Sequence, residues 1–335
     1  MYRDIAKYMY KNITLSNNPI FIVGCPRSGT TLLQALLSTQ YPICSFRETH
    51  FFTKIKPELV IDVTGHVKKC CLNKIFELLH SILDLQLTGK ERDYITALTI
   101  DNKLTPKRLF EIIVYRMLSE QYGTTSKSVV WLEKTPDHAL HLEEICDWYA
   151  SARVIHIVRH PVPVIYSMIN NFKFLEDRSV SLLAERWLVT IEAVDSLSRR
   201  LSILTVKYED LVNNVNKVIK SICGYLHVEF NQQALNQYTA KAKVITTNSE
   251  SWKRDVQKQI ISNSNSIALK KCTIFSKMLI YFITRKKSTK YGYFKNMPLI
   301  NVAYLLWKTM VPSYFRLGIR NIIVEGRWRE RDILE

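Results

Sequence analysis

The stretch Pro19-Ile-Phe-Ile-Val-Gly24-Cys-Pro-Arg-Ser-Gly29-Thr30-Thr31 decides how this chain is expected to fold. Its first half is a short apolar run, which is typical of a buried strand. The residues from Thr31 to Leu37 have the pattern of a helix, so a tight turn joins the two elements. A helix that begins at such a turn points unpaired N–H groups and its positive dipole end into the loop. The loop therefore favours an anion such as phosphate.

The residue types in this loop also fit phosphate binding. Gly29 allows close approach of the backbone, and the hydroxyls of Thr30 and Thr31 add donors. The spacing matches the Walker A pattern G-x-x-x-x-G-K-[ST], except that Thr30 stands where the lysine belongs. Because a nucleoside triphosphatase needs that lysine on the β- and γ-phosphates, its replacement argues against hydrolysis of ATP or GTP. Arg27, inside the loop, supplies a cation from a different place.

Short apolar strands continue to alternate with helices after the loop. This order predicts an α/β, three-layer, P-loop-like fold with a mostly parallel central sheet flanked by helices. In such a sheet, ligands bind beyond the carboxyl ends of the strands. The expected strands are 43–46, 129–132, 154–158 and 203–206, and the expected helices are 137–149 (capped by Asp137), 162–171, 180–200 and 214–226.

The predicted domain organisation has two parts. Residues 1–260 form the main domain, with a helical insertion at about 51–128 whose clearer helices are 72–85 and 104–121. Ser262-Asn-Ser-Asn-Ser266 is interpreted as a linker. Residues 261–335 follow as a basic, partly apolar, helical C-terminal extension that contains the apolar segments 274–283 and 299–311.

Charge is concentrated in the C-terminal part of the chain. The 335 residues carry a net charge of +17, and residues 241–335 hold 19 basic and 6 acidic residues, a net +13. A basic segment of this kind indicates either an anionic partner or a solvated basic face. The partner that we expect is a polyanionic substrate or an acidic membrane surface rather than a nucleic acid. The chain is 47% hydrophobic and 23% charged, a composition that excludes intrinsic disorder.

The C-terminal extension allows two interpretations. Phe275, Met278, Tyr281 and Phe282, beside Arg285-Lys-Lys287, either make peripheral contact with an anionic membrane or pack against the core, and packing is favoured. The longest apolar stretch, Met278 to Ile283, is too short to span a bilayer, and the N-terminus lacks the apolar region of a signal peptide. We therefore expect a cytoplasmic protein, with membrane association as the alternative.

The cysteines predict no metal site. Seven cysteines are scattered along the chain without a Cys-x-x-Cys pair or zinc-ligand spacing. Reduced, mostly buried thiols are the expected state. His138 and His141 are three residues apart, and we interpret them as surface residues or as supports of the site rather than metal ligands.

A second anion site is predicted after the strand 154–158. Arg159 ends that strand, and Ser167 lies eight residues later, two turns into the next helix. The two side chains can converge on one phosphate through charged and neutral donors. Taken alone, such a spacing is also compatible with an arginine that pairs with a carboxylate.

The loop resembles that of the sulfotransferases that use 3′-phosphoadenosine 5′-phosphosulfate (PAPS). Pro26-Arg-Ser-Gly-Thr-Thr-Leu32 is similar to their 5′-phosphosulfate loop, in the form typical of the tyrosyl-protein, bacterial and carbohydrate branches. The resemblance covers about residues 19–254 and implies PAPS as donor, without a metal. It also implies that Tyr208, in a Y-E-D-L segment, contacts the donor or anchors the strand end. The implied donor-binding residues are Arg27, Ser28, Gly29, Thr30, Thr31, Arg159, Ser167 and Tyr208.

The resemblance also implies three catalytic side chains. Glu48 falls where the tyrosyl-protein branch has a carboxylate base, and Lys134 matches a lysine that faces the sulfuryl group. Together with Arg27, Lys134 neutralises charge on the transferring group while Glu48 accepts the proton of the acceptor. His50, which stands where that branch has an arginine, is the alternative base.

The predicted function is transfer of the sulfuryl group from PAPS to a hydroxyl of an acceptor. A glycan, a lipid, a peptide tyrosine and a small alcohol all fit the sequence. A P-loop nucleotide kinase is the first alternative, but such a kinase requires the Walker lysine, and this loop lacks it. The second is a non-catalytic protein that binds nucleotides or anionic surfaces, for which Glu48→Gln has no effect and removal of residues 260–335 abolishes function.

Overall fold

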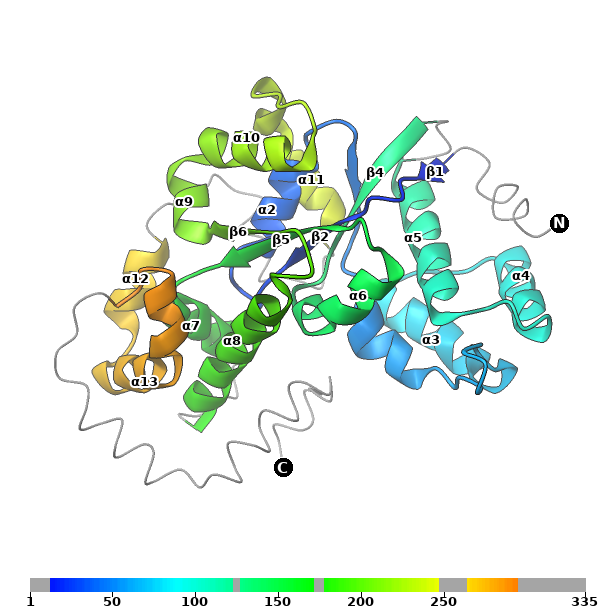
Figure 1. The fold of residues 1–335 in the computed structure, drawn as a ribbon, viewed down its shortest axis with the longest axis horizontal. Coiled ribbons are helices and arrows are strands. Elements are labelled where there is room, and N and C mark those ends of the chain that lie inside the picture. The colour runs from blue at the N-terminus through cyan, green and yellow to red at the C-terminus, as the bar shows by residue number, and fades with distance from the viewer. Residues whose placement is uncertain (1–12, 123–126, 172–177, 247–263, 295–335) are drawn as a thin grey trace.

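The computed structural model describes residues 13–122, 127–171, 178–246 and 264–294. Within these ranges it contains one parallel sheet in which β2 is central, with strand order β1-β4-β2-β5-β6 and β3 also paired with β4 (Figure 1). The α/β architecture is the one that the sequence predicts. The strands are β1 (Ile13–Leu15), β2 (Ile20–Val23), β3 (Ile43–Ser45), β4 (Lys127–Lys134), β5 (Arg153–Val158) and β6 (Ile203–Lys207).

Strand β2 holds the centre of the sheet because all four of its residues are apolar and fully buried. Successive residues point to opposite faces of a strand. Accordingly, Ile20 and Ile22 enter one core while Phe21 and Val23 enter the other. Ile20 lies opposite Leu132 of β4 on one side and opposite Arg153 of β5 on the other.

Helices cover both faces of the sheet, which makes the three layers (Figure 1). The core that contains Ile20 and Ile22 also takes up the apolar sides of α2 and α10. The opposite core takes up α3, α5 and α6. Helices α7 and α8 build a third apolar cluster around Trp187, next to the end of β5. The bounds of these helices are α2 (Thr30–Leu37), α3 (Leu72–Leu83), α5 (Pro106–Tyr122), α6 (Leu142–Trp148), α7 (Pro161–Asn171), α8 (Arg178–Leu197) and α10 (Val215–Leu226).

Within the described part of the predicted main domain, three α-helices have no counterpart among the helices expected from the sequence. Helix α4 (Gly89–Ile100) begins with a capping box formed by Thr88 and Glu91. Helix α9 (Tyr208–Asn213) follows β6 directly, so Tyr208 begins a helix rather than lying in a strand. Helix α11 (Tyr238–Ile245) packs on α2 through Ala242 and Ile245.

The predicted helix over 137–149 is divided and is not capped by Asp137. A 3₁₀ turn (Pro136–His141) precedes α6, and the Asp137 carboxylate accepts two hydrogen bonds from Arg186 Nη2, at 2.7 and 2.8 Å. The capping prediction was wrong because an arginine on α8, distant in sequence, competes for the carboxylate.

The C-terminal extension contributes two described helices, α12 (Ser264–Lys271) and α13 (Ile274–Lys290). The linker interpretation of 262–266 is therefore wrong from Ser264 onward. Helix α13 packs on α7 and α8, and Ile280 and Ile283 enter the cluster around Trp187. The proposed domain boundary near residue 260 and the apolar segment 299–311 lie outside the described residues.

Candidate donor site and catalytic side chains

The predicted site residues gather at one edge of the sheet. The loop at 24–29 follows β2, Glu48 follows β3, Lys134 ends β4, Arg159 follows β5 and Tyr208 follows β6. These are the carboxyl ends of five parallel strands, where α/β sheets bind ligands. Residues that are far apart in sequence therefore share one site.

The loop after β2 is packed too tightly for side chains at its glycines. A Cβ built on Gly29 would lie 2.4 Å from Tyr208 Cδ2, and Gly29 has φ +97°. A Cβ on Gly24 would lie 2.4 Å from the carbonyl oxygen of Ile157. The Tyr208 ring thus rests directly on the backbone where α2 begins, which fixes the direction of the first N–H groups of that helix.

We expect Gly29→Ala to destabilise the protein by about 2–5 kcal/mol. The left-handed backbone costs an alanine about 1–2 kcal/mol, and overpacking against the Tyr208 ring adds about 1–3 kcal/mol. Urea denaturation measures the difference. Gly89→Ala is the matched control, since nothing lies within 4 Å of a Cβ built on Gly89. A loss below about 0.5 kcal/mol in Gly29→Ala would contradict the packing described.

Arg27 connects the loop to the second predicted anion site. Its backbone has φ +71°, its carbonyl oxygen accepts a hydrogen bond from Arg159 Nη1 at 3.0 Å, and its own Nε donates to Ser167 Oγ at 3.0 Å. A non-glycine residue in this backbone region is strained, and such strain concentrates at functional sites. The loop and the Arg159–Ser167 pair therefore form one continuous site.

Two features of this site fit an anionic ligand. The Ser28 hydroxyl is fully buried and lacks a hydrogen-bond partner within the described part of the chain. Arg159 is only 9% exposed, and burial lowers its pKa, an effect that Tyr208, Glu209 and Tyr293 oppose. A buried cation that has lost its water is stabilised by an anion with matching hydrogen-bond geometry.

The Arg159 guanidinium is held from three sides. It lies over the Tyr208 ring, 4.1 Å from its centroid, and its Nε donates to Asn265 Oδ1 at 2.8 Å. Asn265 Nδ2 in turn donates to Glu209 Oε1 at 2.7 Å, and the Tyr293 hydroxyl donates to Glu209 Oε2 at 2.7 Å. Helix α12, through Asn265, and the residues just after α13, through Tyr293, thus brace the second anion site.

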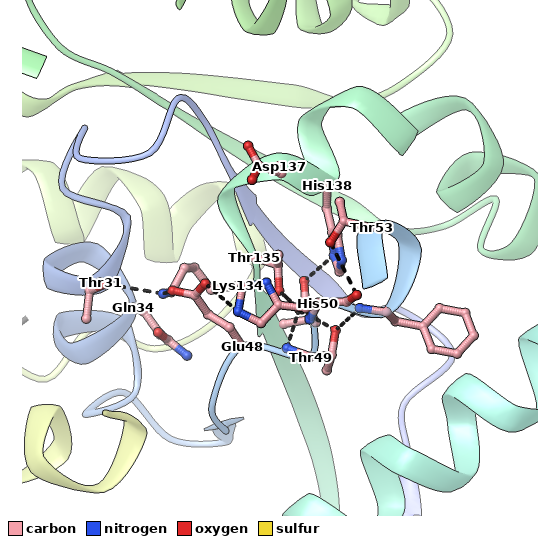
Figure 2. A network of polar contacts seen from close by, with 12 residues as sticks. Thr31, Gln34, Glu48, Thr49, His50, Thr53, Lys134, Thr135, Asp137 and His138 are labelled. Carbon is pink, nitrogen blue, oxygen red and sulfur yellow. Dashed lines mark hydrogen bonds and ion pairs between the residues drawn. The ribbon is translucent and has the colours of Figure 1, made fainter. Parts of the chain in front are cut away.

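Two of the three predicted catalytic residues, Glu48 and Lys134, meet beside the loop (Figure 2). Lys134 is fully buried, and its Nζ pairs with Glu48 Oε1 and lies 3.2 Å from Thr31 Oγ1. The other oxygen of Glu48, Oε2, lies 3.4 Å from His50 Nε2. Lys134 therefore links the carboxylate to the first turn of α2, and both candidate bases lie next to each other.

A buried polar network supports this cluster from beneath. Glu133 Oε1 accepts from Thr49 Oγ1 at 2.9 Å and Thr135 Oγ1 at 2.6 Å, while Oε2 lies 2.9 Å from His138 Nδ1. Thr135 Oγ1 accepts from the His50 N–H at 3.3 Å (Figure 2). Burial by itself raises the pKa of Glu133, but His138 and the threonine hydroxyls hold it below its usual value. The ionised carboxylate fixes the chain that carries Glu48 and His50.

The two histidines of the 3₁₀ turn lie in different surroundings, and His138 is the one that supports the site. His138 is fully buried against Glu133, which agrees with a supporting role and excludes a surface position. Burial lowers the pKa of His141 to about 4, so this imidazole is neutral near pH 7. Within the described ranges, no group of three or more His, Cys, Asp or Glu side chains could hold a metal ion.

Sequence reasoning missed Glu133, Glu209 and Asn265. Asn265 lies in the Ser/Asn stretch that was interpreted as a linker, so its composition pointed away from the site. Glu133 and Glu209 adjoin predicted site residues, Lys134 and Tyr208, and this adjacency is the one signal that could have suggested them.

Comparison with known proteins decides the family. A model of the sulfotransferase family matches residues 19–232, which include every predicted site residue. The chain belongs to the sulfotransferase family. Solved structures agree on the fold of this sulfotransferase. The sulfotransferase domain from the Synechococcus PCC 7002 olefin synthase has a TM-score of 0.59 and 20% identity, covering 86% of this chain and 97% of that one.

A second solved structure supports the same fold. The sulfotransferase domain from the curacin biosynthetic pathway has a TM-score of 0.55 and 18% identity, covering 85% of this sulfotransferase and 100% of that domain. No curated protein matches the chain. Identities at this level support the fold, and the roles of individual residues rest on the geometry above.

Proposed function

We propose that this sulfotransferase moves the sulfuryl group of PAPS to a hydroxyl group of its acceptor and releases adenosine 3′,5′-bisphosphate (PAP). The observation that carries the proposal is the joined anion site, in which Arg27 bonds both Ser167 and Arg159. Next to it lies the Ser28 hydroxyl, which has no hydrogen-bond partner among the residues that the structure describes. PAPS carries phosphate groups on the 3′ and 5′ positions of its ribose, and the two joined anion sites provide one binding place for each. Its phosphosulfate would supply the sulfuryl group.

In the proposed donor site, Ser28, Gly29, Thr30 and Thr31 bind the 5′ side at the start of α2. The N–H groups there and the hydroxyls of Thr30 and Thr31, both buried, suit a phosphate. Arg159 and Ser167 bind the 3′-phosphate. Tyr208 positions Arg159 through the contact of its ring with the guanidinium.

In the proposed reaction, Glu48 accepts the proton of the acceptor hydroxyl while Arg27 and Lys134 stabilise the charge that develops on the leaving side. The Lys134–Glu48 pair supports this assignment, because it holds a base and a cation beside Thr31 of the loop. His50 is the second candidate base and lies against the same carboxylate. The acceptor oxygen gains the sulfuryl group as its proton leaves.

The first experiment is a titration of the purified protein with PAP in a calorimeter. We expect saturable binding at one site, followed by formation of sulfated products when PAPS and a fractionated cell extract are added, detected by mass spectrometry. AMP, which is PAP without its 3′-phosphate, is the control ligand and should bind more weakly, because Arg159 and Ser167 then lack a partner. Failure to bind PAP would overturn the assignment of the donor.

A further inference from the structure

The turn between α12 and α13 exposes two neighbouring large apolar side chains. Ile274 and Phe275 are 69% and 70% exposed, whereas Ile280 and Phe282 further along α13 are buried. The membrane-contact and core-packing interpretations of this segment therefore apply to different residues: Phe282 packs, and Phe275 does not. Single exposed apolar residues are ordinary on protein surfaces, but two adjacent ones at a helix start form a protruding apolar point.

Lysines flank these two apolar residues in the sequence. We define residues 270–277 as the α12–α13 tip, which contains Lys270, Lys271 and Lys277 beside Ile274 and Phe275. Within the described ranges none of these three lysines takes part in an ion pair, whereas Lys287 and Lys290 of α13 both pair with Asp195. Residues 264–294 contain seven basic residues and no acidic residue. The tip is therefore positively charged as well as apolar.

We propose that the α12–α13 tip docks on the surface of a lipid bilayer with anionic headgroups. Ile274 and Phe275 enter the interfacial region, and the lysine ammonium groups lie among the headgroups. A protein partner fits the residue types less well, because lysine is depleted in protein–protein interfaces. Nucleic acid would leave the two apolar side chains without a partner. This inference does not depend on the identity of the donor.

Docking at the tip would bring the proposed donor site close to the bilayer. Helix α12 carries Asn265, which bonds Arg159, near its N-terminus, and the tip begins at its C-terminal end. Eight helical residues span about 12 Å. The enzyme would then work within reach of molecules that are embedded in the membrane surface.

Co-sedimentation with vesicles tests the proposal on the full chain. We expect binding to vesicles of 70% phosphatidylcholine and 30% phosphatidylserine, weakening with salt, and little binding to phosphatidylcholine alone. The double variant Ile274→Ser/Phe275→Ser should bind at least about tenfold more weakly. Lys270→Glu/Lys271→Glu should lose about 30-fold or more, since each lysine near an anionic surface contributes about fivefold.

Matched surface variants distinguish the tip from the general basic charge of the chain. Val63→Ser removes an apolar side chain that is even more exposed than Ile274 and Phe275, and Lys68→Glu/Lys69→Glu changes an exposed lysine pair. Both controls lie in the insertion, far from α12 in sequence. These controls should bind vesicles within about twofold of the parent. Circular dichroism and thermal unfolding of all variants report folding. PAP titration is a separate measurement, so loss of PAP binding alone concerns the proposed function and not the tip.

Three outcomes would overturn the proposal. The first is equal vesicle binding by tip and control variants, which would place membrane contact elsewhere. The second is no preference for anionic vesicles. The third is a change in oligomeric state, seen by light scattering, when Ile274 and Phe275 are replaced, which would assign the tip to contact between two copies of the chain.

Discussion

Replacing Arg159 with alanine is expected to weaken binding of PAP by about 10- to 150-fold. A hydrogen bond to a charged group contributes about 1.5–3 kcal/mol, and Arg159 is the most deeply buried cation of the proposed 3′-phosphate site. The substitution also removes the donor to the carbonyl oxygen of Arg27, so the 5′ loop should loosen at the same time. Calorimetric titration with PAP measures the change.

Arg153→Ala is the matched control for this substitution. Arg153 begins the same strand that Arg159 follows, lies over the Tyr225 ring at 5.4 Å and donates to Ser202 Oγ at 3.3 Å. It resembles Arg159 in chemistry but lies at the opposite end of the sheet. PAP affinity should therefore stay within about twofold. If both variants bind PAP like the parent, Arg159 does not belong to the donor site.

Glu48→Gln is expected to lower kcat by about 100- to 1,000-fold while PAP affinity changes by less than about twofold. A positioned general base contributes about that factor, and glutamine keeps the shape of the side chain while removing its basicity. Steady-state kinetics with PAPS and an acceptor give kcat, and calorimetry gives the affinity. A loss confined to kcat locates the role of Glu48 in the chemical step.

His50→Gln decides between the two candidate bases. If Glu48 is the base, this variant should retain most of kcat, because His50 then lies against the base, at Glu48 Oε2, without taking the proton itself. The reverse pattern, with His50→Gln nearly inactive and Glu48→Gln mildly impaired, would transfer the role to His50. Full activity in both variants would show that neither side chain is the base.

The parallel sheet could be predicted from sequence because its strands are short, apolar and bounded by polar turns. β2 and β5 lie within a residue or two of their expected bounds, and α2 begins one residue early, at Thr30. Helix α4 was missed because its apolar residues are mixed with charges, and its capping box at Thr88 and Glu91 was overlooked. The local sequence pattern was therefore sufficient to predict an element only where burial had made that element uniformly apolar.

The candidate site likewise contains residues that could be predicted from local sequence and contacts that could not. Residues next to strand ends could be placed from sequence, since the sheet brings those ends together. The contacts of Arg159 with Asn265 and of Glu133 with His138 depend on tertiary packing between distant elements, and sequence spacing carries no signal for them. The Lys134–Glu48 pair is intermediate: both residues were expected in the site, but their direct contact was not.

The pairing of β2 has a consequence for how the chain is made. Neither edge of the strand that contains Ile20 can pair until Leu132 and Arg153 have been synthesised, more than a hundred residues later. At about 5–20 residues per second, a ribosome takes several seconds or more to supply them. During that time an apolar segment with open edges is exposed to aggregation. Production of this protein should therefore improve with more of a chaperone that holds nascent chains, and it should fall when translation is slowed.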